Sequence, residues 1–336
     1  MKKIAAFVGS AANVDRVYSK DTLDTLYARY DFIADGKTLT KEELLAHAEC
    51  GKVQYLFSTW GMPHFTNDEI RDALPAAEAV FYGAGSVQAF AKEFLEEGVA
   101  VFSAWAANGV PVAEYTFAQV ILAATGFFGR LHVPGSGNVW PNRPDAAKWP
   151  GNYEIKVGII GAGMIGKMVI ERLRTLEKTG ILVFDPFLPE DKAEALGVTK
   201  CDLPTLFAQC DVISNHLANN PQTVGMLNGA LFDTMKPHAT FINTGRGAQV
   251  VEADMIKALQ DVPTRCAVLD VTFPEPPVAE SPLYTMPNVY LTPHIAGSLG
   301  NEVHRMAEYM AEEADAYTSG QPTRYSVTLK MLETMA

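Results

Sequence analysis

The most informative segment of the chain reads Lys156-Val157-Gly158-Ile159-Ile160-Gly161-Ala162-Gly163-Met164-Ile165-Gly166. Its apolar start predicts a strand over residues 156–160, which runs into three glycines spaced Gly-x-Gly-x-x-Gly. An amphipathic helix is predicted directly afterwards, over residues 164–176. Glycines let such a turn approach a pyrophosphate, which the free N–H groups and the dipole of the helix amino terminus attract. The segment therefore predicts a Rossmann-type unit that binds a dinucleotide.

Apolar runs alternate with helix-forming segments on both sides of this turn. Near-continuously apolar strands of this kind suit parallel sheets that are covered by helices on both faces. The sequence thus predicts an α/β protein with two doubly wound parallel sheets. The predicted strands of the first sheet are 4–8, 53–57, 79–82 and 99–102, and those of the second are 157–160, 181–184, 212–214, 240–242, 267–269 and 289–291.

A long apolar helix over residues 111–128 is predicted to connect the two sheets. Residues 129–153 follow it and are rich in glycine, proline and tryptophan. Trp140 and Trp149, with Phe127 and Phe128 just before them, are costly to leave in water, so this stretch predicts a subunit interface. The last helix, from about Asn301, carries one apolar face and is expected to pack on the amino-terminal unit.

The composition excludes several classes of partner. The chain has 336 residues and a formal net charge of −12, with 48% hydrophobic and 20% charged residues. This acidic balance argues against nucleic acid and anionic membrane surfaces, and no apolar stretch approaches the roughly 20 residues that span a bilayer. The four cysteines fit no zinc pattern, so we expect no metal and reduced thiols in a cytoplasmic protein.

Two charged residues follow strands of the second sheet. Arg246 lies between two glycines after strand 240–242, and its guanidinium fork suits a carboxylate. An acidic protein needs such a local cation to hold an anionic substrate. Asp185 ends the strand after the glycine turn, about 20 residues beyond the last glycine, where a carboxylate accepts from a ribose 2′-hydroxyl. Because it would repel a 2′-phosphate, NAD is favoured over NADP.

A histidine and a glutamate complete a possible acid/base pair. His294 follows Pro293 just beyond strand 289–291, at a sheet edge, and Glu275 is held between Pro274 and Pro276. A carboxylate of this kind can orient a histidine that transfers protons. The other histidines are interpreted as structural, except that His216 also ends a strand near the expected cofactor site.

The order of these motifs resembles the D-isomer-specific 2-hydroxyacid dehydrogenase family. The motifs are Gly-x-Gly-x-x-Gly, Asp, Asn-Thr-Gly-Arg-Gly, Asp-Val-x-x-x-Glu-Pro and Thr-Pro-His-Ile-Ala-Gly, and the resemblance covers nearly the whole chain. It implies a flavodoxin-like substrate domain over residues 1–104 and 297–336 and an NAD-binding Rossmann domain over 105–296. It also implies a cleft between the domains for the substrate, and a homodimer formed through an arm over 128–153.

The resemblance further implies a role for each candidate residue. His294 would protonate the oxygen of a 2-oxo acid as NADH delivers hydride to C2, Glu275 would orient the histidine, and Arg246 would bind the carboxylate and carbonyl oxygen. The expected cofactor-binding residues are Gly161, Gly163, Met164, Ile165, Gly166, Asp185, His216, Thr244, Gly245 and Asp270. The expected substrate-binding residues are Trp60, Gly61, Gly85, Ser86 and Arg246.

Residues 59–64 indicate which kind of substrate side chain the protein could bind. With Trp60 and Met62 and no arginine in this stretch, a phosphate pocket is hard to build, so hydroxypyruvate, glyoxylate or pyruvate-like acids are favoured over phosphorylated ones. Glu275 counts against the formate dehydrogenase branch. The alternative is an NAD(H)-sensing, corepressor-like binding protein with little turnover, which NADH oxidation against a panel of 2-oxo acids would distinguish.

Overall fold

The computed structural model describes residues 2–131 and 148–333. The chain divides into two compact units, Met1–Asn108 with Ser298–Ala336, and Gly109–Gly297. The sequence predicted that the first domain ends at residue 104 and resumes at residue 297. Part of the predicted dimerisation arm, residues 132–147 with Trp140, lies outside the described residues. A cleft between the two units was also predicted. It depends on how the units are placed relative to one another, and it stays a prediction.

The first unit is built on a seven-stranded sheet of order β14-β6-β5-β4-β1-β2, with β3 also paired to β1. The strands are β1 (Ile4–Val8), β2 (Asp31–Phe32), β3 (Thr38–Leu39), β4 (Tyr55–Ser58), β5 (Ala79–Tyr82), β6 (Ala100–Ser103) and β14 (Ser326–Val327). All pairings are parallel except that of β14 with β6. The order of β2, β1, β4, β5 and β6 is that of a flavodoxin-like sheet, which confirms the predicted fold class.

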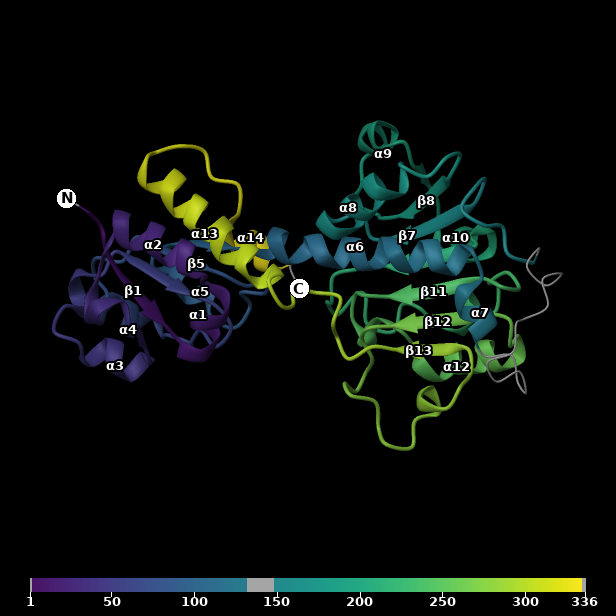
Figure 1. The fold of residues 1–336 in the computed structure, drawn as a ribbon, viewed down its shortest axis with the longest axis horizontal. Helices are drawn as coiled ribbons and strands as arrows, with labels where there is room; N and C mark the ends of the chain where they lie inside the picture. Colours follow the sequence, from purple (N-terminus) through teal and green to yellow (C-terminus); the bar gives the residue numbers. More distant parts are fainter. Residues whose placement is uncertain (1, 132–147, 334–336) are drawn as a thin grey trace. The chain divides into compact units, whose positions relative to one another are not determined.

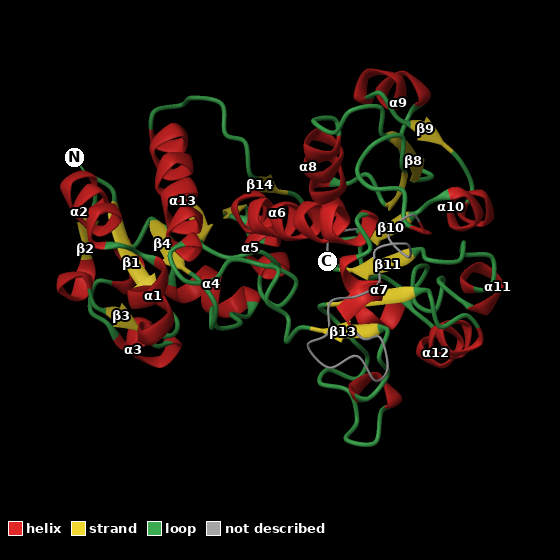
Figure 2. Cartoon of the chain, turned by 45° about the vertical axis from the view of Figure 1, so that its right-hand side comes forward, coloured by secondary structure: helices red, strands yellow, loops and turns green. Residues whose placement is uncertain are grey.

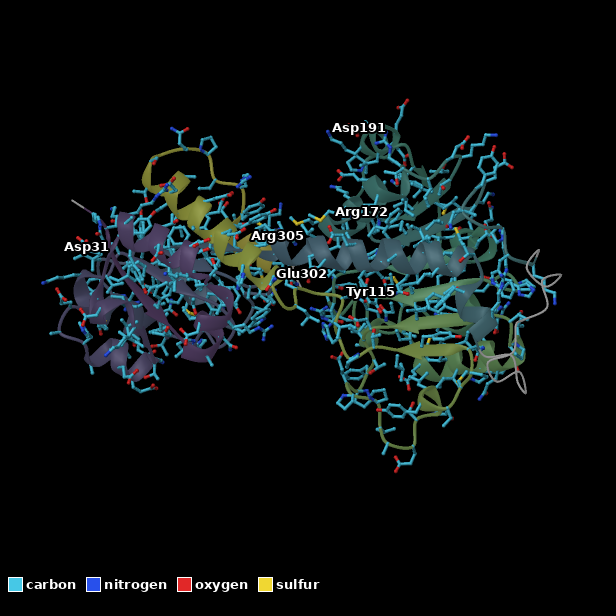
Figure 3. The ribbon with its side chains drawn as sticks, in the orientation of Figure 1. Asp31, Tyr115, Arg172, Asp191, Glu302 and Arg305 are labelled. Atoms are coloured by element: carbon cyan, nitrogen blue, oxygen red, sulfur yellow. The ribbon has the colours of Figure 1, made fainter. Side chains whose placement is uncertain are left out.

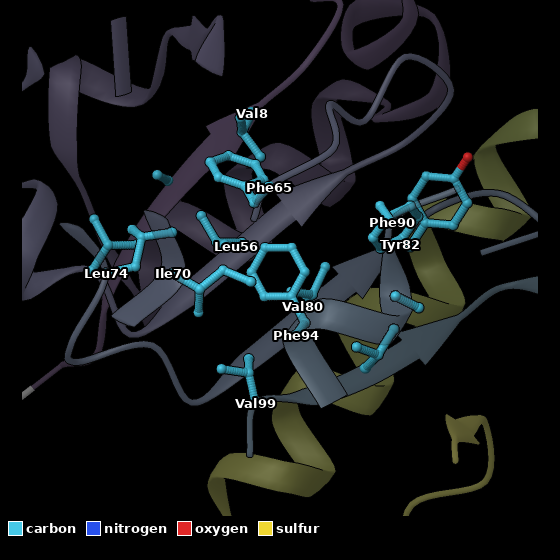
Figure 4. Packing of buried hydrophobic residues seen from close by; sticks show 14 of the residues in the cluster. Val8, Leu56, Phe65, Ile70, Leu74, Val80, Tyr82, Phe90, Phe94 and Val99 are labelled. Carbon is cyan, nitrogen blue, oxygen red and sulfur yellow. The ribbon is translucent and has the colours of Figure 1, made fainter. Parts of the chain in front are cut away.

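Both faces of this sheet are buried against hydrophobic clusters. Successive side chains of a strand point to opposite faces, so neighbouring residues belong to different clusters. Leu56 of β4 belongs to one hydrophobic cluster, together with Phe65, Val80 and Phe94 (Figure 4). Its neighbours Tyr55 and Phe57 belong to the cluster on the other face. The covering helices are α1 (Ala11–Val17), α2 (Lys20–Arg29), α3 (Lys41–Ala46), α4 (Asn67–Ala73), α5 (Ala91–Glu96), α13 (Glu302–Thr318) and α14 (Leu329–Leu332).

The last long helix, α13, packs on the first unit, as the sequence predicted. Its buried residues Met306 and Met310 join the cluster that contains Phe102 of β6. Farther along the helix, the ring of Tyr317 lies 5.3 Å from that of Phe102, edge to face. Apolar and aromatic contacts therefore attach this carboxy-terminal segment to the amino-terminal sheet.

The second unit holds a parallel seven-stranded sheet of order β13-β12-β11-β10-β7-β8-β9 (Figure 1). The order reverses between β7 and β10, which is the place where open α/β sheets bind ligands at their carboxyl edge. The strands are β7 (Lys156–Ile160), β8 (Gly180–Phe184), β9 (Thr199–Lys200), β10 (Val212–Asn215), β11 (Thr240–Asn243), β12 (Cys266–Leu269) and β13 (Val289–Leu291). This is the predicted Rossmann arrangement.

Helices cover both faces of the second sheet (Figure 2). One face packs against α6 (Trp105–Ala124), α7 (Phe127–Leu131), α8 (Met164–Leu173) and α9 (Glu190–Leu196), and the other against α10 (Leu203–Gln209), α11 (Gly229–Phe232) and α12 (Glu252–Asp261). Helix α6 starts at Trp105, before the predicted start at residue 111, and Pro111 lies inside it. Proline removes one backbone donor and crowds the carbonyl four residues earlier, but the alanines at 106 and 107 favour the helix.

Candidate functional site

The three predicted catalytic residues follow three neighbouring strands of the second sheet. Arg246 comes after β11, Glu275 after β12 and His294 after β13, and these strands are adjacent in the sheet. Because the strands are parallel, their carboxyl ends meet at one edge. The topology therefore brings the three residues to the same edge of the sheet.

His294 and Glu275 are in direct contact. Nδ1 of His294 lies 2.7 Å from Oε1 of Glu275, and the two side chains are 47% and 42% exposed. His294 has a φ of 53°, and its backbone N–H donates to the carbonyl of Asp270 at 3.0 Å. The histidine is thus held through its backbone and through Nδ1 of its ring.

Asp270 is a buried carboxylate, 2% exposed, that holds the segment around His294. It accepts from the hydroxyl of Thr292 at 2.7 Å and from the backbone N–H groups of Ile295 and Ala296 at 2.8 and 2.9 Å. The same Thr292 hydroxyl lies 2.9 Å from the hydroxyl of Tyr115, a residue of α6 (Figure 3). These contacts give Asp270 a positioning role that the sequence did not predict; the predicted cofactor contact stays a prediction.

Arg246 lies in a turn that packs directly on the Glu275 segment. Its Nη1 donates to the carbonyl of Gly245 at 2.7 Å. A β-carbon built on Gly247 would lie 2.0 Å from the carbonyl carbon of Thr272, far inside any real contact. Glycine is therefore required at 247, because the backbones of the two loops touch there.

The glycine turn after β7 has one glycine exposed to open space. A β-carbon on Gly161 (φ +89°) would lie 2.8 Å from the carbonyl oxygen of His216, and one on Gly166 would lie 2.1 Å from the carbonyl oxygen of Gly161. One on Gly163 would meet no atom within 4 Å. Helix α8 begins next to it at Met164 without a side-chain cap. Open space in front of uncapped N–H groups fits a pyrophosphate.

Asp185 lies beside this turn, at the end of β8. Its Oδ2 accepts from the backbone N–H of Ala162 at 2.8 Å, and its Oδ1 accepts from that of Phe187 at 2.8 Å. Each carboxylate oxygen can accept a further bond. The carboxylate is thus fixed next to the glycine turn, where a ribose hydroxyl could donate to it.

His216 follows β10 and is surrounded by hydroxyl groups. Its Nε2 lies 2.9 Å from the hydroxyl of Ser214 and its Nδ1 lies 3.5 Å from that of Thr244, another predicted cofactor residue. Burial lowers the pKa of His216 to about 4, so its imidazole is neutral at pH 7. It can offer a hydrogen bond but no positive charge.

The predicted substrate-binding residues of the first unit follow two adjacent strands, β4 and β5. Trp60 accepts a hydrogen bond from Asn13 at its backbone oxygen, at 2.8 Å, and Gly61 has a φ of +91°. The hydroxyl of Ser103 donates to the carbonyl of Gly85 at 2.5 Å and so holds the turn that contains Ser86. These residues belong to a different unit from Arg246.

The sequence prediction missed one cation near Trp60. The guanidinium of Arg16, on α1, lies 5.1 Å from the centre of the Trp60 ring, a distance typical of a cation–π contact. The prediction considered only residues 59–64, whereas Arg16 arrives from a helix that follows β1. Apolar periodicity carries no signal for such a contact.

Residues 2–131 and 148–333 contain no group of three or more His, Cys, Asp and Glu side chains that could hold a metal ion. In the same part of the chain, no helix is both long enough and apolar enough to cross a membrane.

Residues 119–296, more than half of the chain, match the family described as D-isomer specific 2-hydroxyacid dehydrogenase, NAD binding domain. The chain belongs to this family. The match covers the glycine turn, Asp185 and the residues that follow β11, β12 and β13. The family's NAD-binding domain therefore lies in the second unit.

Relatives in this family differ in their named activities. The chain is 32% identical over 241 residues to a D-3-phosphoglycerate dehydrogenase of Archaeoglobus fulgidus, which covers 71% of this chain but only 44% of that protein. It is 28% identical to a formate dehydrogenase of Chaetomium thermophilum, over 95% of this chain and 88% of that one. The chain thus spans less than half the length of the phosphoglycerate dehydrogenase it matches.

Solved structures support the fold. A phosphoglycerate oxidoreductase from Rhizobium etli superposes with a TM-score of 0.81 at 20% identity, over 97% of this chain and 98% of that one. At this identity the likeness shows the two-sheet α/β fold alone.

Proposed function

We propose that this 2-hydroxyacid dehydrogenase family member interconverts a 2-oxo acid and a D-2-hydroxy acid, with NAD(H) as the hydride carrier. The observation that carries the proposal is the 2.7 Å contact between His294 and Glu275. The two residues follow β13 and β12, and β12 is paired with β11, the strand that leads into Arg246. This arrangement offers an oriented proton donor and a fixed cation at one sheet edge. A 2-oxo acid needs both when its carbonyl is reduced.

The residues of the chain then divide the work during reduction. NADH, when bound, supplies the hydride to C2 of the acid. His294 donates a proton from Nε2 to the former carbonyl oxygen, while Glu275 accepts from Nδ1 and keeps the ring oriented. Arg246 stabilises the negative charge that develops on the oxygen, which lowers the barrier rather than only binding the substrate.

NAD is proposed as the cofactor in preference to NADP. Asp185 holds its carboxylate beside the glycine turn through Ala162 and Phe187. In that place it accepts from a 2′-hydroxyl and repels a 2′-phosphate. The remaining proposed contacts are the glycine turn for the pyrophosphate and Asp270 near the nicotinamide. His216, Thr244 and Gly245 complete the proposed cofactor-binding residues.

The proposed substrates are small acids such as hydroxypyruvate, glyoxylate and pyruvate, bound by the first unit through Gly85, Ser86, Trp60 and Gly61. Trp60 and Met62 provide apolar surface after β4, and a single guanidinium, that of Arg16, is a weak partner for a phosphate dianion. A test panel should also include acids that the proposal does not favour: a 2-oxo dicarboxylate, 3-phosphohydroxypyruvate and, in the oxidising direction, formate.

A homodimer in the cytoplasm is proposed as the working form. Tyr153, at the end of the predicted arm, is 47% exposed, and Phe127, just before its start, is 42% exposed, which favours burial of both rings against a second copy; Phe128 is already buried within the chain. All four cysteines are free, as expected in a reducing compartment. Sedimentation of the full chain tests the dimer.

The proposed activity is tested by NADH oxidation at 340 nm against the acid panel, with NADPH in parallel. Turnover of at least one 2-oxo acid supports the proposal, with the D-isomer as product wherever C2 of the product is chiral. Tight NADH binding without turnover of any acid would reject it and leave an NAD(H)-sensing binding protein.

A further inference from the structure

Three buried amide side chains lie beneath the turn that carries Arg246. Asn215 and Asn243 are the last residues of β10 and β11 and are directly paired in the sheet register. Gln249 lies in the short helical turn that follows Arg246. The three residues are 0%, 1% and 0% exposed, and we call them the amide clamp.

The members of the clamp bind one another. Nδ2 of Asn215 donates to Oδ1 of Asn243 at 3.0 Å and to Oε1 of Gln249 at 2.6 Å. Buried polar groups that are satisfied in this way hold one arrangement, since breaking a bond there leaves a donor or acceptor without water. The clamp is therefore a rigid base for whatever it binds.

The clamp holds both backbone polar groups of Arg246. The N–H of Arg246 donates to Oε1 of Gln249 at 3.1 Å, and Nδ2 of Asn243 donates to the Arg246 carbonyl at 3.2 Å. A β-carbon on Gly245 would lie 2.8 Å from Nδ2 of Asn215 and from Oε1 of Gln249. Glycine at 245 thus lets the arginine turn rest directly on the amides.

The clamp also reaches the loop after β10, on the side of the glycine turn. Nε2 of Gln249 donates to the carbonyls of Leu217 and Ala218 at 2.9 and 3.0 Å. The N–H of Leu217 donates to Oδ1 of Asn215 at 3.2 Å. One glutamine therefore accepts from the arginine loop and donates to the loop that begins with His216.

We propose that Gln249 is a positioning residue that fixes Arg246 relative to the loop at residues 216–218, and so relative to the cofactor. This inference rests on the proposed function. The role requires an amide: the oxygen must accept from Arg246 while the nitrogen donates to two carbonyls. A carboxylate would place an oxygen against the carbonyls of Leu217 and Ala218 and would be repelled, so the side chain and the arginine turn would shift.

The variant Gln249→Glu tests this, with Asn288→Asp as a matched control. Asn288 is also buried, at 7% exposed, and its Nδ2 donates to two backbone carbonyls, those of Leu259 and Arg265, at 3.0 and 2.8 Å. Asn288 lies at the amino-terminal end of β13, whereas Arg246 follows the carboxyl end of β11. We expect Gln249→Glu to lower kcat/KM for the 2-oxo acid about 10- to 100-fold, the scale of a misplaced catalytic group, and Asn288→Asp to lower it less than about 3-fold.

A double-mutant cycle with Arg246→Ala shows whether the effect passes through the arginine. In that background Gln249→Glu should lower the residual kcat/KM less than about 3-fold, because no guanidinium is left to misplace. The same loss in both backgrounds, or an equal loss in Asn288→Asp, would overturn the inference. If Gln249→Glu does not fold, Gln249→Met replaces it in the same cycle, because methionine has a side chain of similar length but cannot make the bonds to Arg246, Leu217 and Ala218.

The two proposals can fail separately. Wild-type protein that turns over no 2-oxo acid rejects the proposed function and this inference with it. An active wild type with additive losses in the cycle rejects the inference alone.

Discussion

His294 and Glu275 form a close side-chain contact whose members stay nearly half exposed, with 2.7 Å between Nδ1 and Oε1. Exposed pairs of this kind contribute only about 0–1 kcal/mol to folding. The contact therefore matters for the orientation of the ring more than for stability.

Glu275→Gln should separate these two effects. An amide can still bind the ring but does not stabilise its charged form, so we expect kcat to fall roughly 10- to 100-fold. The free energy of unfolding should change by less than about 1 kcal/mol. Steady-state kinetics and urea denaturation check the two numbers, and an unchanged kcat would remove Glu275 from the mechanism.

His294→Asn should abolish most turnover while the fold stays intact. Asparagine tolerates the positive φ at this position but transfers no proton, so kcat should fall about 10²- to 10⁴-fold. NADH affinity, measured by fluorescence titration, should stay within about 3-fold of wild type because the glycine turn is unaffected. Near-normal turnover would contradict the assignment.

Two alanine variants in the glycine turn should behave in opposite ways. Gly166→Ala drives a β-carbon against the Gly161 carbonyl oxygen and should destabilise the fold by several kcal/mol, whereas Gly163→Ala meets no protein atom. We expect Gly163→Ala to weaken NADH binding about 10-fold or more, because the methyl group occupies the space proposed for the pyrophosphate. Unchanged NADH affinity in Gly163→Ala would place the cofactor elsewhere.

Asp185→Asn should shift the preference between cofactors. The amide removes a negative charge from the ribose site but keeps one oxygen that can accept from a backbone N–H. The ratio of kcat/KM with NADPH to that with NADH should rise about 10-fold, near 1.4 kcal/mol of lost repulsion. A constant ratio would exclude Asp185 from the choice of cofactor.

His216 should make the protein less stable in acid. Burial lowers its pKa to about 4, whereas an unfolded histidine has a pKa near 6.5, so the unfolded chain takes up the proton first as the pH falls. The stabilisation is present above about pH 6.5 and is lost towards pH 4, on the order of 3 kcal/mol in total.

His216→Asn should remove this part of the pH dependence. Denaturation curves between pH 4 and 7 measure it, with His64→Asn as a control because that side chain is 54% exposed. Parallel stability curves for wild type and His216→Asn would show that His216 does not carry the effect.

The sequence predicted the long elements and the family, and it singled out the candidate catalytic residues, because all of these leave local signals. Apolar runs located the main strands, and glycine or proline neighbours singled out Arg246 and Glu275. The two-residue strands β2, β3, β9 and β14 are too short to show a period. The sequence prediction missed the amide clamp formed by Asn215, Asn243 and Gln249. The clamp acts through hydrogen bonds between loops, and strand register decides which loops meet. Arg16 was missed for the same reason, since it meets Trp60 only after folding.

The close approach at Gly247 ties the arginine turn to the segment that leads to Glu275. With the two backbones in contact, neither loop can be lengthened, shortened or decorated without displacing the other. Sequence change that alters substrate choice is therefore expected to accumulate elsewhere, at positions such as Arg16 and Trp60. The loops after β11 and β12 of the second sheet are therefore expected to keep their length and backbone shape, whereas residues that follow strands of the first sheet can vary.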